Sequence, residues 1–323
     1  MQEAILGIDI AKGKFNVNLV KEGKHYQKVC ENNEKGFKEL ERFLEKHKIE
    51  KVHACMEATN TYWEALAEYL YEKGHEVSVV NPSIISSFAK TKLLRNKTDK
   101  QDAKTIAEYC LQHNPIEWKP IAKEIKHLQA LVRRLESLKQ LQQEEKNRLE
   151  STLDQTDVKK SLEQSIEFFE QQIKHVHKLI LEHIKNNSKL KADKDLLTSI
   201  PGIGDLTAAN ILAELINIDN YKSARQAAAY TGLTPKHFTS GTFVNAKPKL
   251  CKIGNSHLRK ILYFPAITAK THNPILKAFA NRLSSPGKHP MVIISALMRK
   301  LIHIAFGVLR SRKPFDPSFL PSC

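Results

Sequence analysis

The sequence lacks the cysteine spacing that marks zinc sites and disulfide frameworks. Its five cysteines are scattered over the chain, and no C-x-x-C pair occurs among them. It also lacks an uninterrupted apolar run long enough for a membrane span, because three basic side chains interrupt the most apolar stretch, 291–309. The chain starts directly with a strand pattern, without the features of a signal peptide. These absences predict a protein of the reducing cytoplasm with no membrane association.

Acidic residues are almost missing from the last third of the chain. Residues 221–323 contain 17 Lys and Arg but a single acid, Asp316, whereas the first 220 residues hold 34 of each sign. The formal charge of +16 therefore belongs to one part of the molecule. A basic domain joined to a neutral one indicates a polyanionic partner, most often a nucleic acid.

Glycine and proline are both missing between Pro120 and Pro201, where Glu, Lys, Gln and Leu dominate. Apolar residues recur there in steps of three and four, in 128–138 and again in 166–180, with a polar stretch at 151–159. This pattern predicts two long helices forming an antiparallel coiled-coil hairpin. Because such a hairpin buries little surface alone, a dimerisation role competes with a helical arm that folds onto its own domain.

The first 118 residues alternate strand and helix patterns. The strand patterns cover 4–10, 15–20, 26–30, 52–56 and 76–80, and the helix patterns cover 34–46 and 63–72. Three strands followed by helix and strand in alternation predict an α/β sheet that begins with an antiparallel meander. This order is that of ribonuclease-H-like folds, in which the first and fourth strands are neighbours and a late helix packs across them.

Two acidic residues lie at strand ends of this predicted sheet. Asp9 stands in G-I-D-I, where a carboxylate between isoleucines is costly to bury unless it is paired or metal-bound. A strand-end Asp satisfied by backbone donors is the alternative interpretation. Glu57 follows the fourth strand, where an ordinary acidic turn residue is the simpler explanation. Neither residue alone indicates a site.

The stretch 94–110 supplies two further acids. Thr98 and Gln101 have the spacing of a capping box, which predicts a helix starting at Asp99. Asp99 and Asp102 then share one face of its first turn, where acids also complement the helix dipole without any function. Together with the two strand-end acids they form a D-E-D-D series. Oxygen ligands in such a cluster bind Mg²⁺, or Mn²⁺ in its place, for phosphoryl transfer.

The segment 196–215 contains P-G-I-G between two short apolar patterns, which is the helix-hairpin-helix motif. Gly202 and Gly204 would let backbone amides at the second helix approach a DNA phosphate without reading sequence. Tight helical hairpins that bind nothing also use glycine, so the structural explanation stays open.

A candidate nucleophile follows in the basic region. Ser240 precedes Gly241 in a predicted loop, and it needs a base or metal for activation and cations to hold a phosphate. An ordinary turn serine is the alternative. Ser256 in G-N-S-H is a rival that we interpret as the cap of a helix over 258–269. The predicted nucleic-acid contacts of this region are Lys236, Lys247, Lys249, Lys252, Arg259 and Lys260.

These motifs resemble a known family. G-I-D-I-A-K, M-E-A-T-N-T-Y-W and R-N-K-T-D-K-Q-D-A are similar to the N-terminal domain of the DEDD insertion-sequence transposases, relatives of the Piv invertase. I-P-G-I-G, Y-T-G-L-T-P, F-T-S-G and K-I-G-N-S-H-L-R-K resemble the C-terminal transposase domain of that family. The resemblance implies a RuvC-like domain over 1–118, a coiled-coil arm over 119–190 and a mostly helical transposase domain over 191–323.

The resemblance also implies a chemistry. Family members cut and rejoin DNA through a serine that becomes linked to the DNA end, beside acids that bind Mg²⁺. Here the metal acids would be Asp9, Glu57, Asp99 and Asp102, and the nucleophile would be Ser240. Some members are guided by a structured noncoding RNA, the bridge RNA. The expected partners are double-stranded DNA, such an RNA, and further copies of the chain in a dimer or tetramer. A nucleoid-associated, prokaryotic location follows.

Three other functions compete with this one. A junction-resolving nuclease would use the same acids with water as nucleophile. An actin-like or sugar-kinase ATPase also begins with G-I-D-I, but it needs a second, D-x-G-G-type phosphate loop, which the sequence does not contain. A binding-only scaffold would keep the nucleic-acid surfaces without chemistry.

Overall fold

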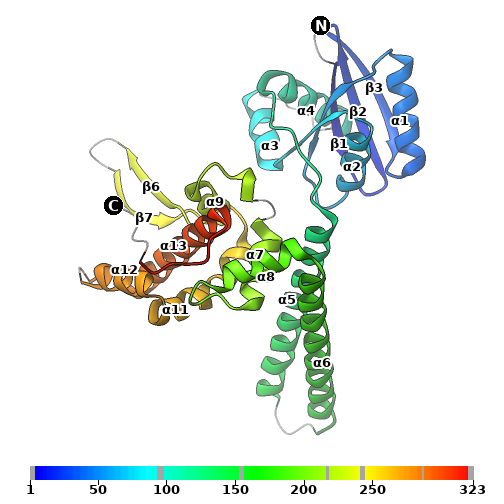
Figure 1. The fold of residues 1–323 in the computed structure, drawn as a ribbon. Coiled ribbons are helices and arrows are strands. Elements are labelled where there is room, and N and C mark those ends of the chain that lie inside the picture. Colours follow the sequence, from blue (N-terminus) through cyan, green and yellow to red (C-terminus); the bar gives the residue numbers. More distant parts are fainter. Residues whose placement is uncertain are drawn as a thin grey trace. The chain divides into compact units, whose positions relative to one another are not determined.

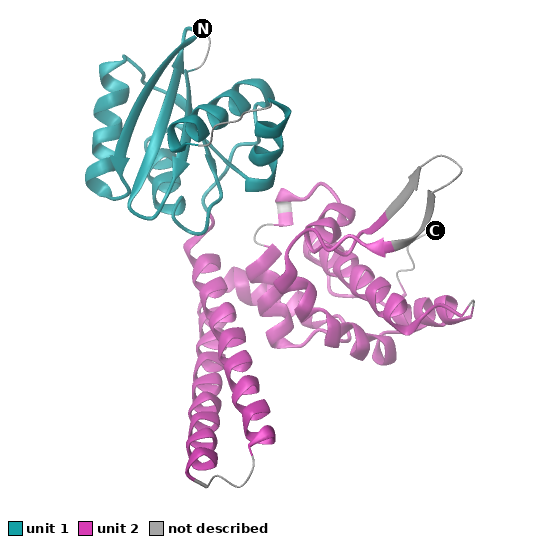
Figure 2. Cartoon of the chain, turned by 180° about the vertical axis from the view of Figure 1, so that it is seen from behind, with its two compact units in different colours: residues 1–120 teal, residues 121–323 magenta. Residues whose placement is uncertain are grey.

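The computed structural model describes residues 4–92, 98–152, 156–215, 218–240, 244–285 and 287–318, apart from the side chains at 156, 219, 237–240 and 244–248. The chain forms two compact units, residues 1–120 and residues 121–323 (Figure 2). Each unit has its own hydrophobic core and is described by itself.

A five-stranded sheet forms the centre of the first unit (Figure 1). Its strands are β1 (Ala4–Ile10), β2 (Lys14–Lys21), β3 (Lys24–Glu31), β4 (Val52–Glu57) and β5 (Glu76–Val80). They lie in the order β3-β2-β1-β4-β5, with the first three antiparallel and with β4 parallel to both β1 and β5. The predicted meander and the predicted neighbourhood of the first and fourth strands are both confirmed.

Helices cover both faces of this sheet. They are α1 (Glu34–Lys46), α2 (Glu64–Glu72), α3 (Pro82–Thr91) and α4 (Asp99–His113). Leu6 and Ile8 of β1 pack with Leu40 of α1 and Leu66 of α2, whereas Ile5 belongs to the cluster around α4. Because side chains alternate along a strand, odd-numbered positions of β1 face α4.

Glycine in the middle of β1 determines how closely α4 approaches. A Cβ atom at Gly7 would lie 2.2 Å from the carbonyl oxygen of Ala103 and 2.3 Å from the amide nitrogen of Ala107, both in α4. Only glycine is compatible with this contact between backbones. The helix therefore lies directly against β1, as the predicted late helix was expected to do.

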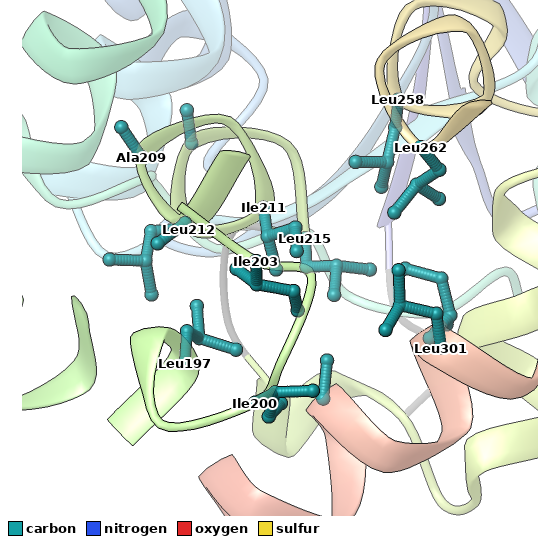
Figure 3. Packing of buried hydrophobic residues seen from close by; sticks show 14 of the residues in the cluster. Leu197, Ile200, Ile203, Ala209, Ile211, Leu212, Leu215, Leu258, Leu262 and Leu301 are labelled. Carbon is teal, nitrogen blue, oxygen red and sulfur yellow. The ribbon is translucent and has the colours of Figure 1, made fainter. Parts of the chain in front are cut away.

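The second unit is mostly helical. It contains α5 (Lys123–Ser151), α6 (Thr156–Asn186), α7 (Ser188–Thr198), α8 (Asp205–Leu215), a 3₁₀ turn (Ile218–Asn220), α9 (Ala224–Tyr230), α10 (Ser256–Ile261), α11 (Tyr263–His272), α12 (Pro274–Ser284) and α13 (Pro290–Ser311). One two-stranded hairpin, β6 (Pro235–Ser240) with β7 (Val244–Leu250), completes the described elements. Leucine, isoleucine and alanine from α7, α8, α10 and α13 meet in its core (Figure 3).

The two long helices α5 and α6 lie side by side over much of their length (Figure 1). Leu128 and Leu135 of α5 and Ile180 of α6 belong to the same hydrophobic core as α8. For this reason the helical pair forms one compact unit with the rest of 121–323. A separate arm domain over 119–190 and coiled-coil supercoiling of the pair stay predictions.

Helix α13 corresponds to the apolar stretch noted in the sequence. Among the described residues it is the one helix long and apolar enough to cross a membrane, and half of its apolar window is buried within the protein. Leu297, Leu301, Ile302 and Ala305 are buried in the core of the second unit. It packs as the predicted core helix.

Candidate functional site

Two of the four predicted metal acids lie at neighbouring strand ends. Ile8 of β1 is paired with Met56 of β4, and Asp9 and Glu57 each follow these paired residues. Alternation places both acids on the face covered by α4, and both side chains are partly buried. The hydroxyl of Thr59 donates a hydrogen bond to Glu57 Oε1 over 3.1 Å. The sheet therefore brings these two carboxylates to one edge.

The other two acids lie in the first turn of α4. The helix begins at Asp99, as the capping pattern predicts, with Thr98 as N-cap accepting a hydrogen bond from the Gln101 amide over 3.3 Å. Asp102 is partly buried, whereas Asp99 is 56% exposed and pairs with Lys14 Nζ at 3.1 Å. Contact between α4 and the middle of β1 positions this turn near the strand that carries Asp9.

The four acids fit a hard divalent cation by their chemistry, since all their donor atoms are carboxylate oxygens. The positions of the four acids do not form a complete metal-binding site. Among the described residues, no three His, Cys, Asp or Glu side chains come together closely enough to hold a metal ion. Asp99 has a protein cation, Lys14, as its partner. The structure thus brings two acids to one edge of the sheet and does not close all four into a coordination shell.

The predicted nucleophile lies in the β6–β7 hairpin of the second unit. Ser240 is the last residue of β6 and is paired with Val244 of β7, so it ends a strand rather than standing within a loop as predicted. Its side chain, residues 241–243 and the side chain of Lys247 lie outside the described residues. The hairpin therefore determines the course of the backbone at Ser240.

Lysines are placed directly opposite each other on this hairpin. Lys236 of β6 is paired with Lys249 of β7, and both side chains are exposed. Lys252, two residues beyond β7, is exposed as well. Like charges at opposed positions destabilise a strand pair unless an anion lies between or above them. This arrangement concentrates positive charge on the described part of the hairpin, and polyanion binding by these lysines stays a prediction.

Two of the predicted nucleic-acid contacts have protein partners instead. Arg259 Nη1 donates hydrogen bonds to the carbonyl oxygens of Thr231 and Lys252, each over 3.1 Å. Lys260 Nζ lies 2.8 Å from Glu136 Oε1. These contacts hold parts of the second unit together, so the role of these two residues in binding nucleic acid stays a prediction.

Ser256 does not cap its helix as predicted. The N-cap is Asn255, whose Oδ1 accepts a hydrogen bond from the Leu258 amide over 2.9 Å, and α10 starts at Ser256. Asn accepts this bond as well as Ser does, and the sequence pattern did not distinguish the two. The predicted single helix is also divided at Leu262 into α10 and α11.

The P-G-I-G segment joins α7 and α8, and its two glycines have different environments. Gly202 has φ of +105°, and a Cβ atom there would lie 2.6 Å from Ala269 Cβ in α11, so this glycine is required for packing. Gly204 is exposed and has open space around it. A pocket of about 420 Å³ lies beside it, lined by Gly202, Ile203, Gly204, Thr207, Phe264, Pro265 and Thr268. Phosphate contact by either glycine stays a prediction.

Comparison with known proteins identifies the family. A profile described as "Transposase" matches residues 6–157, and the profile of the "Transposase IS116/IS110/IS902 family" matches residues 194–281. The "Pilin gene-inverting protein" of Moraxella bovis is 33% identical over 319 residues, which is 98% of each chain. The "Transposase for insertion sequence element IS1328" of Yersinia enterocolitica is 22% identical over 94% of this chain and 96% of its own.

The chain belongs to the IS116/IS110/IS902 family of transposases. It is therefore an enzyme of the DNA transposase and recombinase class. Among solved structures, T. thermophilus RuvC in complex with a Holliday junction substrate matches 36% of this chain and 100% of that chain, at 12% identity and a TM-score of 0.27.

The sequence also contained site features that its motifs did not reveal. Lys14 pairs with Asp99, and the missing side chain of Gly7 lets α4 pack directly against β1. A glycine inside a strand is a signal of close backbone approach, so the sequence itself contains the indication that another element packs against β1 at Gly7. The pairing of Lys14 depends on the order of the strands and had no local signal.

Proposed function

We propose that this enzyme cuts and rejoins DNA through a covalent link between Ser240 and a DNA end. The observation that carries the proposal is the placement of Asp9 and Glu57 at adjacent strand ends, on the face that α4 covers with Asp99 and Asp102. Carboxylates at such an edge are suited to Mg²⁺, or Mn²⁺ in its place. A divalent ion bound there supplies a positive charge that stabilises the oxygens of the phosphoryl group during transfer.

The serine step is a phosphoryl exchange. The hydroxyl oxygen of Ser240 forms a bond to a backbone phosphorus of DNA, and the bond from that phosphorus to one sugar oxygen breaks. The serine proton ends on the released sugar hydroxyl. Attack by the sugar hydroxyl of another strand reverses these changes and joins the new strands. Because the phosphodiester energy is conserved in the link, rejoining needs no added energy source.

The cationic hairpin supports this assignment. Lys236 and Lys249 oppose each other on the paired strands β6 and β7, and Ser240 is the last residue of β6. A DNA phosphate between these ammonium groups relieves their repulsion and holds the DNA backbone on the hairpin that carries Ser240. The electrostatic contact to phosphates carries no sequence information, which is consistent with reading of the target through a structured guide RNA.

Assembly from several copies is part of the same proposal. Ser240 belongs to the second compact unit, whereas the four acids belong to the first. The working site therefore requires two units to meet, within one chain or between chains, and recombination requires two DNA partners at once. Leu141, Val158 and Phe168 are exposed apolar side chains on α5 and α6, where contacts in a dimer or tetramer would bury them.

The finer structural assignments belong to the same proposal. They are a RuvC-like sheet, a supercoiled α5–α6 arm and a helix-hairpin-helix formed by α7 and α8, in a cytoplasmic, nucleoid-associated enzyme. The strand order β3-β2-β1-β4-β5 supports the first of these assignments.

A denaturing gel tests the serine chemistry. Protein is mixed with Mg²⁺, junction DNA and a transcript of the flanking noncoding region, and compared with Ser240→Ala, Asp102→Ala and Ser256→Ala. We expect a covalent protein–DNA adduct in the wild type and in Ser256→Ala. Loss of Ser240 removes the nucleophile, and loss of Asp102 lowers the rate by at least about a hundredfold, as for other groups that stabilise phosphoryl transfer.

A metal-dependent nuclease that uses water as nucleophile is the second candidate. The observation that favours it is that the acids lie in a compact unit without the serine. This candidate predicts cleavage without an adduct, and cleavage that persists in Ser240→Ala. That result would remove the serine mechanism and leave the acids as the whole catalytic site.

A further inference from the structure

The second unit buries a carboxylate that the proposed chemistry does not use. Glu214, near the end of the apolar helix α8, has a side chain that is 1% exposed. Arg133 of α5 donates to both of its oxygens, from Nε over 3.0 Å and from Nη2 over 3.2 Å. Asn255 Nδ2 donates a third hydrogen bond over 2.6 Å. A charge buried so completely is destabilising unless every such partner is in place.

Burial raises the pKa of Glu214, but the hydrogen bonds from Arg133 and Asn255 and the charges of Arg133 and His257 together lower it by more, so the pKa lies below the usual value. The carboxylate is therefore ionised at neutral pH. It acts as a charged acceptor shared between a residue of the long helix α5 and a residue at the start of α10.

Asn255 connects this carboxylate to the segment that follows β7 and leads into α10. Its backbone amide donates to the carbonyl oxygen of Tyr230 over 2.6 Å, and its side-chain oxygen caps α10 at Leu258. Its Nδ2 also lies 3.3 Å from the Tyr230 hydroxyl. The residue before it, Gly254, has φ of +135°, and a Cβ atom there would lie 2.3 Å from the Tyr230 carbonyl oxygen. This turn is consequently pressed against the end of α9.

The two chain segments at the base of the hairpin are joined to each other. The Cys251 amide donates to the Thr234 carbonyl over 2.9 Å, and Arg259 Nη1 bonds the carbonyls of Thr231 and Lys252. A Cβ atom at Gly232 would lie 2.4 Å from Arg259 Nη1, so the guanidinium lies directly over this glycine. The hairpin therefore leaves the unit from a base held by Arg259 and Asn255.

We propose that Glu214 is a positioning residue for Ser240, acting through Asn255 on the base of the β6–β7 hairpin and through Arg133 on the long helix α5. The inference rests on the proposed function, because Ser240 is the group that is positioned. Glu136, one turn beyond Arg133 on α5, pairs with His257 and Lys260 of α10 and adds a second link along the same face. A displacement of α5 is thus transmitted to the hairpin through these contacts.

The test compares two buried carboxylates in the full-length protein. Glu214→Gln keeps the shape but removes the charge that Arg133 and Asn255 share. Asp193→Asn removes a similarly buried carboxylate, 12% exposed and paired with Arg312. Hydrogen–deuterium exchange is measured over residues 229–257, together with the rate of adduct formation at saturating DNA and the Kd for DNA.

We expect Glu214→Gln to speed amide exchange at the hairpin base and to slow adduct formation, each on the order of tenfold, as for loss of one hydrogen bond to a charged group. The Kd stays within about twofold, since Glu214 contacts no DNA in the proposal. Arg133→Lys, at a side chain that is 59% exposed, keeps the charge but loses the two-pronged contact, and it produces a smaller change in the same direction.

Equal exchange in Glu214→Gln and Asp193→Asn would overturn the inference, as would faster exchange with an unchanged adduct rate. If the wild type forms no adduct, the serine chemistry has failed, and the exchange measurement alone decides whether Glu214 holds the hairpin. The two proposals are therefore separated by independent readouts.

Discussion

At the scale of single residues, partners determine what each charged group does. Lys14 and Asp99 form an ion pair with both side chains 56% exposed, and such a pair contributes less than about 1 kcal/mol. Glu214 makes its ion pair with Arg133 while almost fully buried. Removing Arg133 would take away two of the three hydrogen bonds described for this buried carboxylate, which is strongly destabilising. The Lys14–Asp99 pair is therefore a weak surface contact, whereas the Glu214 network joins segments of the second unit.

His303 of α13 differs from Glu214 because it is a partly buried base whose Nε2 has no hydrogen-bond partner among the described atoms. Burial, together with the nearby charges of Arg299, Lys300 and Arg225, lowers its pKa to about 4. The ordinary histidine value is 6.5. Between these two values the unfolded chain binds a proton that the folded protein excludes, so stability falls as the pH decreases from 6.5 towards 4.

We therefore predict that wild-type protein loses about 1.4 kcal/mol more stability than His303→Gln between pH 7.5 and pH 5.5, one pKa unit of linkage. Urea unfolding at the two pH values measures the difference. His175→Gln, at an exposed position on α6, is the matched control and should keep the wild-type pH dependence. A parallel pH dependence for the wild type and His303→Gln would contradict the assignment.

At the scale of secondary-structure elements, the contact of α4 with β1 determines how close Asp99 and Asp102 come to the strand that carries Asp9. Gly7→Ala would place a methyl group against the backbone of Ala103 and Ala107, where no side chain can move aside. We predict a loss of about 3 kcal/mol or more in the free energy of unfolding. Metal-dependent DNA cleavage should fall with it, because α4 carries Asp99 and Asp102.

Gly13→Ala provides the control for this change. Gly13 lies in the turn between β1 and β2, and a Cβ atom there would meet nothing within 4 Å. Its stability in chemical denaturation should stay within about 0.5 kcal/mol of the wild type. Similar losses in both variants would show that the contact with α4 is not the cause.

Local patterns predicted most of these elements well. The capping pattern identified Asp99 as the first residue of α4, because the hydrogen bond that starts the helix is made by Thr98, three residues before Gln101. Local patterns were less successful around Ser256, where Asn255 is the cap, and around Ser240, which ends a strand. At Ser256 two neighbouring polar residues satisfy the same capping rule. At Ser240 the pairing of β6 with β7 makes a strand end where a loop was predicted.

At the scale of the whole molecule, the charge is concentrated in residues 221–323, with a net value of +16. We predict a steep fall of DNA affinity with salt, because each neutralised phosphate releases counterions. Lys249→Gln should reduce the slope of log Kd against log salt by about 1, since this exposed lysine faces Lys236 on the hairpin. Fluorescence anisotropy over a salt series measures the slope.

Lys260→Gln is the comparison, because this lysine pairs with Glu136. Its contribution to the slope should be clearly smaller than that of Lys249. If the two variants change the slope equally, the division between phosphate contacts and internal contacts is wrong.

The sequence by itself determined the strands and most helices of the first unit, the two long helices and the choice of acidic candidates, because periodicity, capping and charge are local properties. It also determined the basic character of the second unit. Only the tertiary structure showed three features. They are the common face of Asp9 and Glu57, the direct opposition of Lys236 and Lys249, and the burial of Glu214. These depend on strand register and on contacts between residues distant in the chain, such as Arg133 and Glu214, and no local pattern contains that information.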